Sequence, residues 1–145
     1  NHLFKNLTTL THISLASVES IGSEAFKGCS GLEDALVFNN LKELGDEAFK
    51  DCTNIPSISM NSLTDLGLNA FSGCTNLTTI SVNALEAIGN SAFEGASALE
   101  SISMNSATTI GENAFKDCTS LTTISFANLE SKKLKFSSIS FVVLK

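Results

Sequence analysis

The sequence predicts an α/β solenoid built from a short recurring unit, with short parallel strands on one side and short helical turns on the other. The period is 22 or 23, because phenylalanine recurs in steps of 22, 23, 22, 22 and 22 at Phe4, Phe26, Phe49, Phe71, Phe93 and Phe115. Within each unit, the spacing of apolar residues changes from a helical one to alternation. Because one helical turn and one strand are too small to bury their apolar sides alone, successive units have to stack.

The first half of each unit predicts a helical turn. Ile110, Ala114, Phe115 and Cys118 have spacings of four, five and eight residues, which place them on one face of a helix. The expected N-cap positions hold residues whose side-chain oxygens accept backbone N–H groups, namely Ser23, Asp46 and Asn90.

The second half of each unit predicts a short strand that pairs in parallel with the strand of the next unit. Leu121, Ile124 and Phe126 lead into an alternation of apolar and small polar residues, which is typical of a strand with one buried face. One extra residue near Glu33 and Asp34 accounts for the single longer step between phenylalanines. We expect a turn to absorb this insertion at little cost.

The units divide the chain into two regions. Residues 1–129 hold five complete units and a partial N-terminal one, and residues 130–145 form an irregular segment that we interpret as a truncated repeat or a cap strand. Because the chain begins inside a unit, we expect it to be a fragment that associates with itself through its solenoid ends. The candidate residues for self-association are Leu3, Phe4, Leu7 and Leu10.

Composition and motifs exclude several functions. The chain has 9 Lys+Arg and 15 Asp+Glu, a net charge of −6, and no tryptophan or tyrosine, so it lacks the cationic and stacking residues of nucleic-acid binders. No apolar run approaches the roughly 20 residues of a membrane span. Two histidines and no known catalytic motif predict no enzyme, no cofactor and no metal site. Asn6 and Asn76 begin glycosylation sequons that arise readily by chance.

Four cysteines recur at the repeat period, at Cys29, Cys52, Cys74 and Cys118. We interpret them as free thiols that fill a buried column as small apolar groups, because Ala96 takes the same place in the fourth unit. The alternative is one disulfide between neighbouring units. A zinc site is disfavoured, since the column has no C-x-x-C spacing and both histidines lie outside it.

The repeated block resembles the BspA-like leucine-rich repeats of bacterial and protist surface antigens. It is carried by Ile21-Gly22-Ser23-Glu24-Ala25-Phe26-Lys27-Gly28-Cys29, by its counterparts at 44–52, 66–74 and 110–118, and by the Leu-x-x-Ile strands that follow. The resemblance implies a right-handed leucine-rich-repeat solenoid with its sheet on the concave side and helical turns on the convex side. It also implies an extracellular or cell-surface setting. The family often has proline after the strand, where this chain has asparagine.

With this resemblance, the leading hypothesis is a non-catalytic adhesion or recognition module for a protein or surface glycan ligand. The alternatives are a structural spacer or self-assembling unit, and a binder of ice or a regular polymer through a grid of hydroxyl groups. The candidate concave-face binding residues are Ser57, Ser59, Thr79, Ser81, Ser101, Ser103, Thr123 and Ser125. Since apolar residues between them face the core, we expect these hydroxyls to face solvent.

Overall fold

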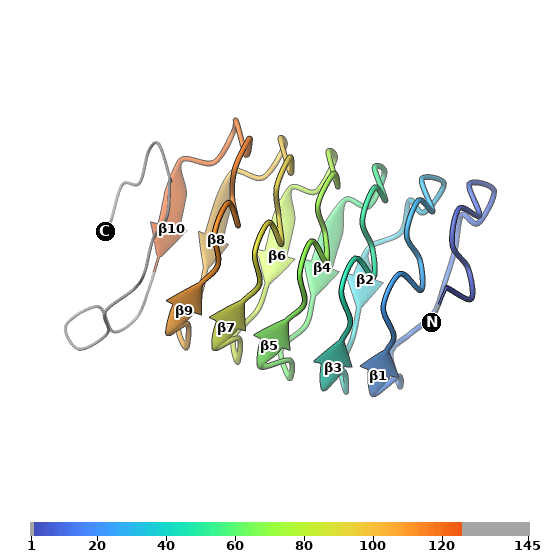
Figure 1. Ribbon diagram of the computed structural model, residues 1–145, viewed down its shortest axis with the longest axis horizontal. Coiled ribbons are helices and arrows are strands. Elements are labelled where there is room, and N and C mark those ends of the chain that lie inside the picture. Colours follow the sequence, from blue (N-terminus) through green and yellow to red (C-terminus); the bar gives the residue numbers. More distant parts are fainter. Residues whose placement is uncertain (1, 126–145) are drawn as a thin grey trace.

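The computed structural model describes residues 2–125, which form a solenoid of five coils with two short strands in each coil (Figure 1). The first strands of the coils are β1 (Ser20–Ile21), β3 (Glu43–Leu44), β5 (Asp65–Leu66), β7 (Ala87–Ile88) and β9 (Thr109–Ile110). The second strands are β2 (Leu36–Val37), β4 (Ser57–Ser59), β6 (Thr79–Ser81), β8 (Ser101–Ser103) and β10 (Thr123–Ser125). Residues 2–18 precede the first coil without a strand and are called the N-terminal half-coil below.

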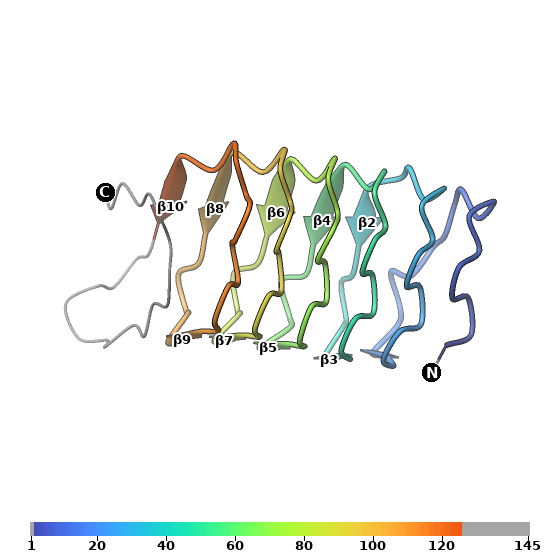
Figure 2. The same cartoon turned by 45° about the horizontal axis from the view of Figure 1, so that its top comes forward.

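The strands make two parallel sheets that lie on different sides of the coils (Figure 2). Their orders are β1-β3-β5-β7-β9 and β10-β8-β6-β4-β2. The predicted period and parallel pairing are confirmed, since Leu66 pairs with Ile88 and Ile58 with Ile80. The sequence pattern predicted one strand in each unit, whereas the structure has a second one that precedes the regularly spaced glycines, such as β5. The right-handed sense of the coil remains a prediction.

The predicted helical turns are wrong, because the structure has no helix within residues 2–125. The backbone around each phenylalanine bonds to the neighbouring coil instead of to itself. The N–H groups of Glu24, Phe26 and Gly28 donate to carbonyl oxygens of the next coil at 2.9, 2.8 and 2.8 Å. A helix needs each of these N–H groups for the carbonyl four residues earlier. Because alternate backbone N–H groups donate to the next coil, the hydrogen bonds of a helix cannot form.

Two residues in each coil adopt a left-handed backbone, which also interrupts a helix. They lie two residues before and two residues after the phenylalanine, as in Glu24 (φ 56°) and Gly28 (φ 73°). Glu47 and Asp51 repeat the pattern in the next coil at 55° and 61°. L-residues pay a steric cost in this conformation, so the neighbouring coils have to impose it.

Two of the three residues predicted as helix N-caps, Asp46 and Asn90, do accept backbone N–H groups, but from the next coil. Asp46 Oδ1 accepts from the N–H of Leu68 at 2.8 Å, and Asn90 Oδ1 accepts from the N–H of Glu112 at 2.8 Å. Both bonds span 22 residues. The oxygens predicted to cap one helix therefore tie one coil to its neighbour.

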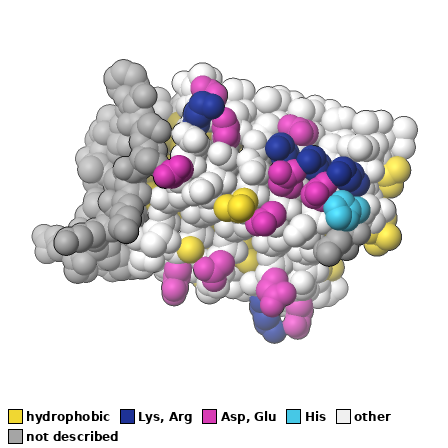
Figure 3. Space-filling view, viewed as in Figure 1, with side chains coloured by type: hydrophobic (Ala, Val, Ile, Leu, Met, Phe, Trp, Pro, Cys, Tyr) yellow, Lys and Arg dark blue, Asp and Glu magenta, His cyan; other side chains and the backbone are white. Residues whose placement is uncertain are grey.

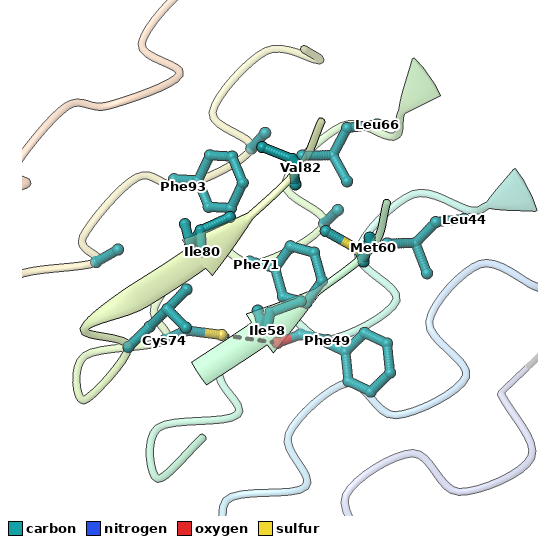
Figure 4. Close-up of a cluster of buried hydrophobic side chains, with 14 of the residues drawn as sticks. Leu44, Phe49, Ile58, Met60, Leu66, Phe71, Cys74, Ile80, Val82 and Phe93 are labelled. Atoms are coloured by element: carbon teal, nitrogen blue, oxygen red, sulfur yellow. Dashed lines mark hydrogen bonds between the residues drawn. The ribbon is translucent and has the colours of Figure 1, made fainter. Parts of the chain in front are cut away.

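The core is a column of phenylalanine rings flanked by aliphatic side chains from both sheets (Figure 4). Consecutive rings from Phe4 to Phe115 stack with centroid distances of 5.0–5.8 Å and interplanar angles of 5–11°. Phe49, Phe71 and Phe93 are fully buried, and no polar or charged residue of the described part is buried. Burial of apolar area in this column is thus the main source of stability.

A column of glycines lets the coils approach closely beside the first strands. A Cβ atom on Gly89 would lie 2.7 Å from the carbonyl oxygens of Gly67 and Leu66, so no larger residue fits without separating the coils. Gly95 differs, because its φ is +76° and an added Cβ would have no atom nearer than 3.8 Å. Gly89 is required because there is no room for a Cβ atom, whereas Gly95 is favoured because of its left-handed backbone conformation.

The predicted C-terminal segment, residues 130–145, lies outside the described residues, as do residues 126–129 of the predicted repeat region. The division of the chain at residue 129 therefore stays a prediction.

Replacing Phe71 with alanine should lower the free energy of unfolding by about 3–5 kcal/mol, because the ring fills the space between two coils. Leu68→Ala is the matched control in the same coil, since Leu68 is 46% exposed, and should cost no more than about 0.5 kcal/mol. Urea unfolding of both variants measures the difference. Equal midpoints would contradict the position of Phe71 in the core.

Of two glycine substitutions, the one that adds the smaller side chain should destabilise the protein more. Gly89→Ala should destabilise the protein by about 1–3 kcal/mol, because its methyl group collides with the preceding coil. Gly95→Asn should cost less than about 1 kcal/mol, because Asn6 and Asp51 hold the same position in other units with φ of 61°. Thermal unfolding compares the two variants, and a larger loss for Gly95→Asn would refute the close approach at Gly89.

Candidate interaction surface

The outer face of the sheet β10-β8-β6-β4-β2 carries the eight hydroxyl residues that the sequence analysis selected. They lie on β4, β6, β8 and β10, on either side of the buried residues Ile58, Ile80, Ile102 and Ile124. Parallel register aligns them in two columns that cross the strands. The first residue of each strand forms the column called inner below, which is Ser57, Thr79, Ser101 and Thr123. The third residue of each strand forms the outer column, which is Ser59, Ser81, Ser103 and Ser125.

The outer column is engaged in hydrogen bonds within the protein. The amide of Asn61 donates to Ser59 Oγ at 3.3 Å, and Ser81 Oγ donates to Asn61 Oδ1 at 3.3 Å. Ser125 Oγ donates to Ser103 Oγ at 3.0 Å. The bonds made by Ser81 and Ser125 join neighbouring coils, so the outer column has a structural role in addition to its exposure.

The inner column is different, because its four side chains make no hydrogen bond to any part of residues 2–125. Thr79 and Ser101 are exposed, and Ser57 and Thr123 are half-buried. Each hydroxyl can donate one hydrogen bond and accept two. The sequence placed both columns on this face but gave no indication that only one of them is uncommitted.

Neither column contains a charged or aromatic side chain, so recognition on this face depends on shape and hydrogen bonds. The pattern changes at β2, where Ala35 and Val37 take the places of the hydroxyl residues. Val37 is 47% exposed and gives this end of the face an apolar character. Tyrosine, tryptophan and arginine, which dominate high-affinity protein interfaces, are absent from the sequence.

The residues selected for self-association lie in the N-terminal half-coil. Leu3 and Leu7 are 75% and 44% exposed. Phe4 and Leu10 are partly buried against the core, and the ring of Phe4 stacks on Phe26 at 5.1 Å. The structure therefore separates the four residues into two exposed and two that already pack within the chain.

A groove of about 540 Å³ crosses β1, β3 and β5 on the other sheet, where the sequence analysis had expected helical surface. The residues that line it include Gly22, Gly45 and Gly67 together with the acidic Glu43 and Asp65. The alternation of polar and apolar residues in Glu43–Leu44 and Asp65–Leu66 is the sequence feature that could have revealed these strands.

Ion pairs link the coils beside the phenylalanine column. Glu24 bonds to Lys5 of the half-coil and lies 3.2 Å from His2, while Lys27 bonds to Glu47 of the next coil. Figure 3 shows these lysine and acidic side chains interleaved at the N-terminal end of the molecule. Hydrogen bonds from Lys5 and His2 lower the pKa of the Glu24 carboxyl to about 2. These charges are neutralised within the chain and serve to align coils.

The cysteines are free thiols, and the preferred interpretation of them is confirmed. The thiols of Cys52 and Cys74 donate to the carbonyl oxygens of Phe26 and Phe49 in the preceding coil, at 3.0 and 3.3 Å (Figure 4). Burial raises the pKa of Cys52 to about 12 and raises that of Cys74 well above its usual range. The column thus consists of thiols that donate hydrogen bonds between coils.

Residues 2–125 place no group of three or more histidine, cysteine or acidic side chains where they could hold a metal ion. They also contain no helix of the length and apolarity needed to cross a membrane.

Comparison with known proteins identifies one family. A family model described as a BspA-type leucine-rich repeat region, with six copies, matches residues 1–122 and 62–141. No curated protein matches the chain significantly.

Two solved structures resemble the fold. A leucine-rich cell surface protein from Faecalibacterium prausnitzii is 29% identical, covers 79% of this chain and superposes with a TM-score of 0.71. A leucine-rich repeat protein from T. pallidum is 23% identical, covers 90% of this chain and superposes with a TM-score of 0.66. The chain spans only 31% and 63% of the lengths of these two proteins.

The thiols should react with a disulfide reagent only after unfolding. All four should titrate in guanidinium, whereas Cys52 and Cys74 should react at least about 100-fold more slowly in the native protein, because the thiolate is disfavoured by burial. Cys118 is only partly buried, but burial raises its pKa to about 12 as well, so it should also react slowly, and the thiols of the protein unfolded in guanidinium are the comparison. Rapid labelling of Cys74 without unfolding would contradict this account.

Proposed function

Because the chain belongs to the BspA-type leucine-rich-repeat family, we propose that it is a non-catalytic surface module for adhesion or recognition, which binds through the hydroxyl face of β4, β6, β8 and β10. Proteins of this family are generally interaction modules. A cell-surface setting is supported by the description of the F. prausnitzii protein. The proposed ligand is a protein or a surface glycan.

The single observation that carries the binding face is the inner hydroxyl column. Ser57, Thr79, Ser101 and Thr123 present donors and acceptors at successive coils, and no group within residues 2–125 satisfies them. Parallel strands repeat at about 4.8 Å, so the column offers regularly spaced hydrogen-bonding groups. A ligand that replaces water on this column gains hydrogen bonds without breaking any that hold the coils together.

The regular spacing also favours a second candidate function, binding to an ordered polymer or to ice. This alternative uses the same residues but requires a ligand that repeats along the solenoid axis. Thermal hysteresis measured on the whole chain tests ice binding. A freezing-point gap that disappears in Thr79→Lys would favour this alternative over protein recognition.

A third candidate function is a spacer that assembles through its ends, which the exposed side chains of Leu3 and Leu7 favour. Sedimentation at several concentrations tests it. Association that Leu3→Ser and Leu7→Ser abolish would support this function, and a monomer at every concentration would oppose it.

The decisive experiment compares the two sheet faces with a matched pair of variants. The whole chain is tested against an array of purified extracellular proteins and glycans, and each ligand found is measured again with variants. Thr79→Arg with Ser101→Arg should weaken binding at least about tenfold. The control, Ser20→Arg with Thr109→Arg, adds the same charge to exposed residues of the other sheet and should leave affinity unchanged.

Two results would contradict the proposed face. One is a ligand whose affinity falls only in the control variant, which would move the binding surface to the sheet that contains β1. The other is that no ligand on the array binds the variant with Thr79→Arg and Ser101→Arg more weakly than it binds the unmodified chain.

A further inference from the structure

The groove on the sheet β1-β3-β5-β7-β9 has a shape suited to an extended chain. Gly22, Gly45 and Gly67 line it, and they have no side chain that would stand above the sheet. Because an equivalent glycine occurs in every coil, this strip without side chains crosses from one coil to the next. Leu44 and Leu66 in the lining are buried. What the groove offers to another molecule is therefore backbone and the polar side chains beside it.

Two carboxylates beside the groove have no cation as a partner within residues 2–125. Glu43 on β3 and Asp65 on β5 are exposed and hold equivalent positions in the register of these neighbouring strands. Each accepts a hydrogen bond from a hydroxyl, Glu43 from Ser20 at 3.3 Å and Asp65 from Thr64 at 2.7 Å. Parallel strands lie about 4.8 Å apart, so the two charges repel each other, and a cation beside them is attracted by both.

The lysines of residues 2–125 are already paired with carboxylates. Lys42, which also lines the groove, lies 2.9 Å from Glu19. The others pair within the same part of the chain, and they are Lys5, Lys27, Lys50 and Lys116. The remaining basic residues of the sequence are Lys132, Lys133, Lys135 and Lys145. A cation for the groove therefore comes from residues 130–145 or from another kind of molecule.

Residues 130–145 complement the groove in charge. They contain four lysines and one glutamate, a net charge of +3, whereas residues 1–129 contain five lysines and 14 acidic residues, a net charge of −9. Acidic side chains predominate along the edge of the molecule that carries β1 to β9 (Figure 3). The two hydroxyl columns of the other sheet contain no charged side chain. Opposite charge therefore directs this segment to the groove and away from the hydroxyl face.

The groove and the lysine-bearing segment belong to opposite ends of the solenoid. The groove crosses β1, β3 and β5, whereas the segment follows β10, which lies at the other end and in the other sheet (Figure 1). A second copy can bring its segment to the groove without any chain having to turn back across its own solenoid. Such a contact joins two unlike surfaces, so each added copy still offers a groove of its own.

We propose that the groove over β1, β3 and β5 binds the lysine-bearing residues 130–145 of a second copy of this chain, with ammonium groups placed at Glu43 and Asp65. This surface differs from the hydroxyl face and from the exposed Leu3 and Leu7, so the association is separate from both. Exposed ion pairs are individually weak. Salt shortens the reach of such charges from about 30 Å at 0.01 M to about 3 Å at 1 M, so the association should be reversible and confined to low salt.

Sedimentation of the full chain at low salt and several concentrations tests the groove. Glu43→Gln with Asp65→Asn should raise the dissociation constant at least about threefold, because two attractive charges are lost. The matched control is Glu100→Gln with Glu112→Gln, which removes the same charge from two exposed carboxylates outside the groove. The control should leave the dissociation constant within about twofold of that of the unmodified chain.

A charge exchange tests whether the occupant is a second copy. Glu43→Lys with Asp65→Lys should not associate alone, because its groove repels its own lysines. Lys132→Glu with Lys133→Glu should not associate alone either, because its groove then meets carboxylates. A mixture of the two variants should associate, since each offers the charge that the other's groove or segment attracts.

Three results would overturn the proposal. One is an unmodified chain that stays monomeric at low salt, and another is a mixture of the two charge-exchanged variants that stays monomeric, as it would if each segment bound its own groove. The third is association that Leu3→Ser with Leu7→Ser abolishes and the groove variants leave unchanged, which would assign self-association to the N-terminal half-coil. None of these results bears on ligand binding by the hydroxyl face, which is measured with Thr79 and Ser101.

Discussion

The hydrogen bond between coils is the interaction on which the rest of this structure depends. At the column phenylalanines from Phe4 to Phe93, and at the residues two positions before and after each, the N–H group points to the next coil rather than along its own. This requires a left-handed residue at two positions in every coil, and it prevents a helix. The same close approach stacks the phenylalanine rings and makes glycine necessary beside the first strands. Core packing and backbone bonding therefore share one repeat distance and stabilise each other.

A shared repeat distance also decides which side chains remain available. Small oxygen-bearing residues are abundant in this chain, and many of them are used between coils, as when Thr78 and Thr122 donate to the carbonyl oxygens of Pro56 and Glu100. Buried thiols do the same along the cysteine column. Against this background, the inner row of hydroxyls on the outer face of β4 to β10 is distinct, because it has no hydrogen-bond partner among residues 2–125. Its availability follows from geometry, because strand side chains that point outward cannot reach the backbone of a neighbouring coil.

The sequence was sufficient for the features that depend on periodicity, and insufficient for those that depend on backbone conformation. Phenylalanine and isoleucine recur with the coil, so the parallel register, the buried faces and the outward position of Ser57 or Thr79 could be predicted. The left-handed positions two residues before each phenylalanine could not, because they hold residues such as Glu24, Glu47 and Ser91 rather than glycine, and such residues suggest helix or turn equally well. The spacing of Ile110, Ala114 and Phe115 fits a helix too, although Ile110 ends a strand. Two-residue strands such as β5 are too short to show alternation of their own.

The inserted residue shows how local such a structure is. In a solenoid each coil contacts only its neighbours, so an error of register can be confined to one seam. Here the pairing of β2 with β4 is regular, and the irregularity lies entirely on the other side of β2, toward residues 12–18. The expectation that a turn absorbs the insertion was therefore correct for the first coil but incomplete for its neighbour, which lost a strand. Charged side chains at His12 and Asp34 replace backbone bonds at that seam. The insertion therefore changes the kind of interaction that joins the coils as well as their register, because an imidazole–carboxylate contact and the apolar side chains of Ile13 and Leu15 take the place of a backbone ladder there.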